Sequence, residues 1–212
     1  MPQPFPSDYF KRQDDSADSL FYTQARKVVH IDDKAIALLT DYYARHLPQN
    51  GVLLDLMSSW RSHLPATITP QRITGLGMNE DEMQSNPQLN EFVLQDLNKN
   101  PRLPFPDQSF DAATCAVSVQ YLTQPLAVFQ EVNRVLKPGG IFILSFSNRC
   151  FPTKAVAVWL ASTDRQHVAL VERYFAESEN WFDVQAEEKK GPHDPMFIVS
   201  GRRLQKMASD NL

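Results

Sequence analysis

The sequence predicts an α/β fold with a mostly parallel sheet, and three observations within residues 110–146 carry this prediction. Residues 113–119 are an apolar, β-branched run bounded by polar residues, as expected of a strand buried on both faces. A helix is expected from Pro125, because apolar residues recur at helical spacing at Val128, Phe129, Val132, Val135 and Leu136. Residues 138–140, Pro-Gly-Gly, should end that helix, and residues 141–146 read as a second buried strand. This βαβ unit implies parallel strands, with a ligand site beyond their carboxyl ends.

The remaining elements are expected to alternate along the chain. Asp32 or Asp33 can cap a helix whose apolar stripe reaches Tyr43, and a second helix is expected over residues 164–179. Further strands are expected at residues 52–56, 72–75, 91–94, 181–186 and 196–200. The last two form a terminal hairpin. Together with the two strands of the βαβ unit, the chain is expected to have seven strands.

Bulk properties exclude several classes of protein. A chain of 212 residues is long enough for one α/β domain with a sizeable core. The net charge of -4 offers no basic footprint for nucleic acid. The two cysteines and five histidines show no metal-type spacing, so a reducing, cytoplasmic setting and no metal site are expected. No apolar run is long enough for a transmembrane segment. We expect an N-terminal arm over residues 1–30 and one domain over residues 31–212.

Two motifs identify a family resemblance. Residues 103–111 read LPFPDQSFD, and residues 131–140 read EVNRVLKPGG. In this order and spacing they resemble the paired signatures of the class I S-adenosylmethionine-dependent methyltransferases, in particular the ubiquinone/menaquinone-biosynthesis type. The resemblance extends more loosely over residues 52–204. It implies a Rossmann-like fold with strand order 3-2-1-4-5-7-6, only strand seven antiparallel and helices on both faces.

The resemblance also implies cofactor-binding residues. Asp55 matches the acidic residue that opens the family's first motif and organises the cofactor loop near the methionine moiety; the plainer alternative is a cap for the next helix. Asp96 matches the residue that accepts a hydrogen bond from the adenine amino group, with the Leu97 amide facing the ring.

The chain departs from the family pattern at two places. The first loop of the family is D-x-G-x-G-x-G, but residues 55–61 read DLMSSWR, which removes the glycines that allow close backbone approach. The acidic residue for the ribose hydroxyls is replaced by Gly77, so Asn79 or Glu80 must substitute, and Asn79 is our choice. Either the loop binds the same cofactor through Met57, Ser58 and Ser59, which we favour, or the domain has abandoned catalysis.

Further candidates lie on the arm and at the rim of the sheet. Tyr22, Arg26 and His30 recur every fourth residue, which indicates either an ordinary surface face or a lid whose Arg26 meets a carboxylate. Residues past the fourth and fifth strands match the rim where the family meets cofactor and acceptor: Ser118, Tyr121, Ser147, Asn148 and Arg149. We assign Ser118 to the cofactor and Tyr121, Ser147 and Asn148 to the acceptor; ordinary loop chemistry is the alternative.

The sequence therefore favours a methyltransferase that uses S-adenosylmethionine, releases S-adenosylhomocysteine and acts on a small or lipophilic molecule. The alternative is a non-catalytic protein of the same fold with a binding or regulatory role. A nicotinamide-dependent oxidoreductase is disfavoured, because the phosphate-binding glycines are absent from the sequence. The methyl acceptor, a general base and the oligomeric state are not predicted.

Overall fold

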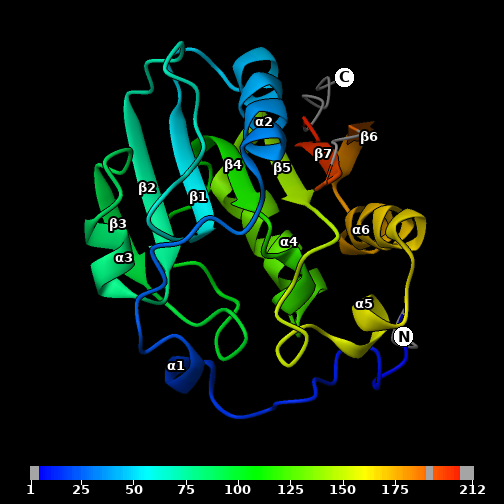
Figure 1. Cartoon of the computed structure of the whole chain (residues 1–212). Helices are drawn as coiled ribbons and strands as arrows, with labels where there is room; N and C mark the ends of the chain where they lie inside the picture. Colours follow the sequence, from blue (N-terminus) through cyan, green and yellow to red (C-terminus); the bar gives the residue numbers. More distant parts are fainter. Residues whose placement is uncertain (1–4, 190–192, 206–212) are drawn as a thin grey trace, which may run out of the picture.

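The computed structural model describes residues 5–189 and 193–205, and its centre is a seven-stranded sheet (Figure 1). The order β3-β2-β1-β4-β5-β7-β6 is the one that the resemblance implied. Only β7 runs against its neighbours, pairing antiparallel with both β5 and β6. The predicted fold class is confirmed. The strands are β1 Val52–Ser58, β2 Arg72–Gly77, β3 Glu91–Leu94, β4 Phe110–Ala116, β5 Leu136–Phe146, β6 Trp181–Lys189 and β7 Met196–Arg203.

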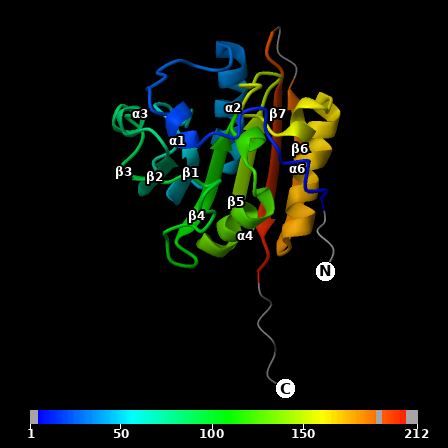
Figure 2. The ribbon, with the colours of Figure 1, turned by 90° about the horizontal axis from the view of Figure 1, so that it is seen from below.

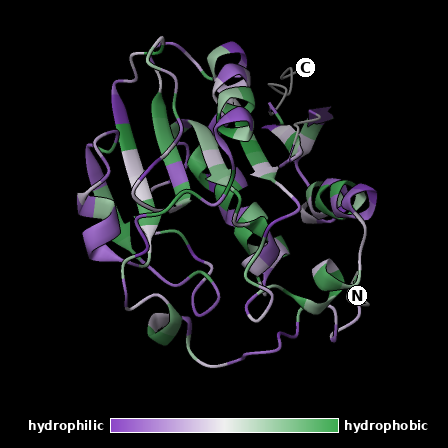
Figure 3. Ribbon diagram, viewed as in Figure 1, coloured by the Kyte–Doolittle hydropathy of each residue, from purple (hydrophilic) through white to green (hydrophobic). Residues whose placement is uncertain are grey.

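Helices cover both faces of the sheet and bury two separate cores. Alternate strand residues point to opposite faces, so Leu53 packs with α2 (Asp33–His46), whereas Leu54 packs with α4 (Pro125–Val135) and α6 (Asp164–Ser178). The central strands are accordingly apolar in Figure 3. The smaller helices are α1 Asp18–Phe21, α3 Glu80–Gln84, the 3-10 helix η1 Val119–Tyr121 and α5 Ala157–Leu160. Asp32 caps α2, since its side chain accepts the Ala35 amide at 2.8 Å.

Three expectations from the sequence require correction. No helix lies in residues 59–71, between β1 and β2, so strands and helices do not alternate there. The strand expected over residues 113–119 spans 110–116 instead, because Val117 has a φ of 46° and leaves the extended conformation. The helix α4 ends at Val135, before the Pro-Gly-Gly segment, since Leu136 is already extended and pairs with Phe110 of β4.

The N-terminal arm runs across the carboxyl ends of the strands. It begins beside α6, where the Phe5 ring meets Tyr174 edge-on at 5.5 Å. It then pairs with the segment before α5, through the bridge from Arg12 to Val156, and passes along the lower side of the sheet to α1 (Figure 1). Seen from below in Figure 2, this segment lies in front of the strand ends.

The two family motifs meet at Arg134. Its guanidinium donates to the carbonyl oxygens of Leu103 (3.0 Å) and Phe105 (2.9 Å) and to the carboxylates of Asp107 and Glu131 (both 2.7 Å). The first motif is thereby tied to α4, and the connection between β3 and β4 is held in place. The motif pair thus encodes a structural clamp.

Removing this clamp should destabilise the fold. We expect Arg134→Ala to lower the free energy of unfolding by about 2 kcal/mol, because charged donors are lost to several acceptors at once. For a chain of this size that is about 4–8 °C in Tm. Differential scanning calorimetry measures the shift, and Arg165→Ala, at an exposed position of α6, is the matched control. Equal Tm values for the two variants would contradict the clamp.

Candidate functional site

A cavity of about 340 Å³ lies at the carboxyl ends of the parallel strands, underneath the arm. The segments that follow β1, β2, β3, β4 and β5 all contribute to its walls, and the arm contributes residues between Asp18 and His30. A parallel sheet places its ligand site at this edge, as expected from the βαβ unit.

The end of β1 is shaped by a bulge and a buried carboxylate. Met57 is an extra residue in the pairing of β1 with β2. Its φ of 55° is a strained backbone conformation for any residue other than glycine. Asp55 accepts hydrogen bonds from the hydroxyls of Ser58 (2.5 Å), Ser62 (2.6 Å) and Thr114 (3.0 Å). Burial raises the pKa of Asp55, and the three hydroxyl donors partly offset that rise. Asp55 therefore organises the loop through side chains.

Two more strained residues border the same cavity. Val117, after β4, and His63, after β1, have φ values of 46° and 56°. Backbone strain of this kind persists only where the surroundings over-determine it, and it clusters at functional sites. Burial, and then the nearby Arg61, lower the pKa of His63 to about 4, so its imidazole is neutral at pH 7.

The end of β2 offers two polar side chains, both on or next to α3. Asn79 accepts the Glu82 amide at 3.0 Å and donates to the Tyr22 and Thr23 carbonyls of the arm at 2.8 and 3.3 Å. Glu82 accepts the Ser59 hydroxyl and the Arg26 amide, both at 2.6 Å, and its side chain lines the cavity. The arm, the loop after β1 and α3 are thus joined at one point.

The turn after β3 carries Asp96 and Leu97, and both line the cavity. Asp96 Oδ1 accepts the amides of Asn98 (2.9 Å) and Lys99 (3.3 Å), which fixes the turn. Its Oδ2 has no partner among residues 5–189 and 193–205, so it remains able to accept a hydrogen bond from a ligand.

The arm places the guanidinium of Arg26 in the wall of the cavity. The Arg26 Cζ lies 4.3 Å from the centre of the Phe21 ring and 5.7 Å from that of Phe151, in cation–π geometry. Its Nη1 is buried and has no hydrogen-bond partner within the part of the chain that the structure describes. Phe151 also contacts the rings of His30 (5.2 Å) and Tyr121 (6.1 Å). A half-buried guanidinium with one unpaired nitrogen suits an anionic group.

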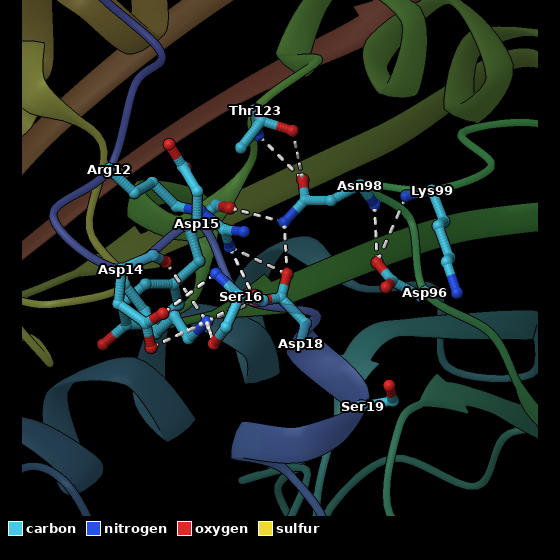
Figure 4. A network of polar contacts seen from close by, with 12 residues as sticks. Arg12, Asp14, Asp15, Ser16, Asp18, Ser19, Asp96, Asn98, Lys99 and Thr123 are labelled. Atoms are coloured by element: carbon cyan, nitrogen blue, oxygen red, sulfur yellow. Dashed lines mark hydrogen bonds and ion pairs between the residues drawn. The ribbon is translucent and has the colours of Figure 1, made fainter.

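A buried polar cluster anchors the arm beside the cavity (Figure 4). Asp18 accepts from both Arg12 Nη1 (2.7 and 2.8 Å to its two oxygens) and Asn98 Nδ2 (2.9 Å). Asn98 also donates to the Tyr121 carbonyl and accepts from Thr123. The arm, the Asp96 turn and the rim after β4 are linked through this one amide.

The structure brings most of the predicted site residues together. The ten residues assigned to the cofactor and Tyr121 from the acceptor side all line the cavity: Tyr22, Arg26, Asp55, Met57, Ser58, Ser59, Asn79, Asp96, Leu97 and Ser118. Ser147 and Asn148 are not among the lining residues of the described chain; Arg149, Cys150 and Phe151 take that place. Glu82 was not among the predicted residues, because its position five residues after Gly77 matches no motif of the family.

Other kinds of site find no support in the described ranges. Within residues 5–189 and 193–205, no three histidine, cysteine or acidic side chains come together in a way that could hold a metal ion. No helix in the same ranges combines the length and apolar character that a bilayer crossing requires.

Comparison with known proteins connects this geometry to a family. A family model described as a methyltransferase domain matches residues 61–144. The ubiquinone/menaquinone biosynthesis C-methyltransferase of Chromobacterium violaceum is 34% identical over 98 residues, which are 44% of this chain and 39% of that protein. The chain spans less than half of the length of the curated relatives that it matches.

Solved structures share the fold. The putative methyltransferase in complex with the Haloferax volcanii Trm112 methyltransferase activator superposes with a TM-score of 0.62 at 17% identity, covering 82% of this chain and 90% of that one. Phosphoethanolamine N-methyltransferase 2 of Haemonchus contortus, in complex with S-adenosyl-L-methionine, gives 0.58 at 12% identity, covering 82% of this chain and 53% of that one. The expectation from the two motifs is confirmed: the chain resembles the class I S-adenosylmethionine-dependent methyltransferases, and within them the ubiquinone/menaquinone-biosynthesis type.

Proposed function

We propose that this protein binds S-adenosylmethionine in the cavity under the arm and transfers its methyl group to a small or lipophilic acceptor. The observation that carries the proposal is the set of ten expected cofactor residues lining one cavity at the carboxyl ends of the strands. The buried, unpaired Nη1 of Arg26 supports the fit, since the cofactor has a carboxylate.

Each wall of the cavity has a part in holding the cofactor. Asp96 accepts the adenine amino group through its free Oδ2, and Leu97 packs against the ring. Ser58, Ser59 and Ser118 supply hydroxyls near the methionine moiety in place of the missing glycine backbone. Arg26 meets the carboxylate, and the arm with Tyr22 excludes water from the reacting groups.

The cofactor, when bound, supplies the methyl group together with its positively charged sulfur leaving group. The protein then has to align the acceptor and keep the site dry. Tyr121 and Phe151 form an aromatic wall suited to an apolar or planar acceptor. Burial raises the pKa of Tyr121 to about 12, so its phenol stays protonated and acts in positioning.

A non-catalytic protein of this fold is the alternative, and the altered loop after β1 is the observation that raises it. Without the glycines, side chains of the loop have to replace the contacts that the protein backbone would make with the cofactor. Ligand binding separates the two functions.

S-adenosylhomocysteine should stabilise the purified protein. A ligand that binds only the native state at one hundred times its Kd adds about 2.7 kcal/mol to the free energy of unfolding. We expect a rise in Tm in a thermal-shift titration with S-adenosylhomocysteine and none with NAD. A flat response to both ligands would favour the non-catalytic alternative.

Asp96→Asn should shift the preference of the cavity from the adenine-containing ligand to its inosine analogue. The asparagine Oδ1 can still accept the turn amides, but its Nδ2 cannot accept from the adenine amino group. We expect calorimetry to show S-adenosylhomocysteine affinity reduced on the order of tenfold. The inosine analogue, which has a carbonyl oxygen in place of that amino group, should be favoured by the variant. An unchanged preference would disprove the proposed adenine site.

Arg26→Met should lower the affinity only for ligands that carry the amino-acid group with its carboxylate. We expect a loss on the order of tenfold for S-adenosylhomocysteine, and little change for 5′-methylthioadenosine, which lacks the carboxylate. Lys27→Met is the matched control, because Lys27 pairs with Asp81 on the exposed side of the arm at 2.9 Å. Equal losses for both ligands, or none, would rule out carboxylate recognition by Arg26.

A further inference from the structure

The end of β2 has no room for the acidic residue that the family pattern places there. A β-carbon on Gly77 would overlap the Ser58 carbonyl oxygen and lie 2.7 Å from Met83 Sδ. Both neighbours belong to fixed elements, the bulged end of β1 and the buried face of α3. The close approach of β1 to β2 therefore requires glycine, and a side chain that reads the ribose must come from another element.

Glu82 is the acidic side chain best placed for this role. It lies in α3, the helix that follows β2, is 7% exposed, and lines the cavity. Each of its carboxylate oxygens accepts one hydrogen bond in the structure, from Ser59 Oγ and from the Arg26 amide. A carboxylate oxygen has two acceptor sites, so both oxygens retain capacity for a further donor.

Asn79, the residue chosen from the sequence, is already committed. Its Oδ1 caps α3 and its Nδ2 donates to two carbonyl oxygens of the arm. A ribose hydroxyl would have to displace one of these contacts. Asn79 therefore fixes α3 and the arm relative to each other, which orients Glu82.

We propose that Glu82 is the residue that recognises the ribose hydroxyls of the nucleoside cofactor, and that it couples their binding to closure of the arm. This inference rests on the proposed function and assigns the ribose subsite within it. The same carboxylate joins the loop after β1 through Ser59, the arm through Arg26, and the ribose. The two ribose hydroxyls would thus donate to the Glu82 carboxylate, which already accepts a hydrogen bond from the arm.

The decisive comparison uses Glu82→Gln with two ligands, S-adenosylhomocysteine and its analogue without the two ribose hydroxyls. The glutamine can still accept the Arg26 amide and donate to the Ser59 hydroxyl, so the lid contacts survive the substitution. By calorimetry we expect a loss on the order of tenfold for S-adenosylhomocysteine and less than about twofold for the analogue.

Two further variants keep the test independent of folding. Glu80→Gln changes an exposed carboxylate of the same helix, which accepts a hydrogen bond from Gln84, and should leave both affinities unchanged. Ser59→Ala removes the contact between Glu82 and the loop after β1 but keeps the carboxylate and its bond to the arm, and should preserve the preference for the ribose diol even if Glu82→Gln fails to fold.

The outcomes distinguish this inference from the proposed function. Equal losses for both ligands in Glu82→Gln would overturn the ribose assignment while leaving cofactor binding intact. Loss of the diol preference in Ser59→Ala would also count against it. Failure of the unaltered protein to bind S-adenosylhomocysteine would overturn the proposed function, and the ribose assignment with it.

Discussion

The candidate site depends on the ion pairs and hydrogen bonds of one buried ammonium group, that of Lys154. This side chain is fully buried, and its Nζ contacts the carboxylates of Asp14 (3.0 Å) and Asp18 (3.3 Å) and donates to the Ser16 carbonyl (2.8 Å). A buried charge is tolerated only when it is paired and hydrogen-bonded, and here most of the partners come from the arm. If the arm left the sheet, Lys154 would lose these partners. The arm is therefore held over the strand ends by an electrostatic requirement of the domain itself.

That anchor determines what can line the cavity. Asp18 belongs both to the charged cluster and to the cavity wall, and eight residues further along Arg26 reaches Glu82 and the aromatic ring of Phe151. The lid is fixed at one end by the ions around Lys154 and at the other by polar contacts with α3. A ligand that bridges Arg26 and Glu82 would strengthen the second attachment without having to create the first.

The sequence predicted the central strands well, because β1, β4 and β5 contain the apolar runs that are typical of strands buried on both faces. It also pointed to Asp55, within β1, and to Asp96, after β3, which the structure brings to the wall of one cavity. It could not predict the path of the arm, since residues 22–31 form no regular element and their positions depend on Asn79, Glu82 and Trp60 far along the chain. Glu82 was missed for the same reason: its role depends on the space denied at Gly77. The absence of a helix after β1 fits the two prolines, Pro65 and Pro70, which lie within residues 59–71 and interrupt helical hydrogen bonding.

The altered loop after β1 is better explained by replacement than by decay. A loop that had lost its ligand would be free to relax, yet Met57, His63 and Val117 keep strained backbones around the cavity. The serines that stand in and near the family's glycine positions are used in a specific way: Ser58 and Ser62 satisfy Asp55, and Ser59 satisfies Glu82. In the family pattern, glycines let the loop backbone approach the ligand. In this chain, serine hydroxyls fix the conformation of the loop. This arrangement leaves Arg26 Nη1 buried without a partner in the described chain, a position that suits an anionic group, and it agrees with the retained binding that we propose.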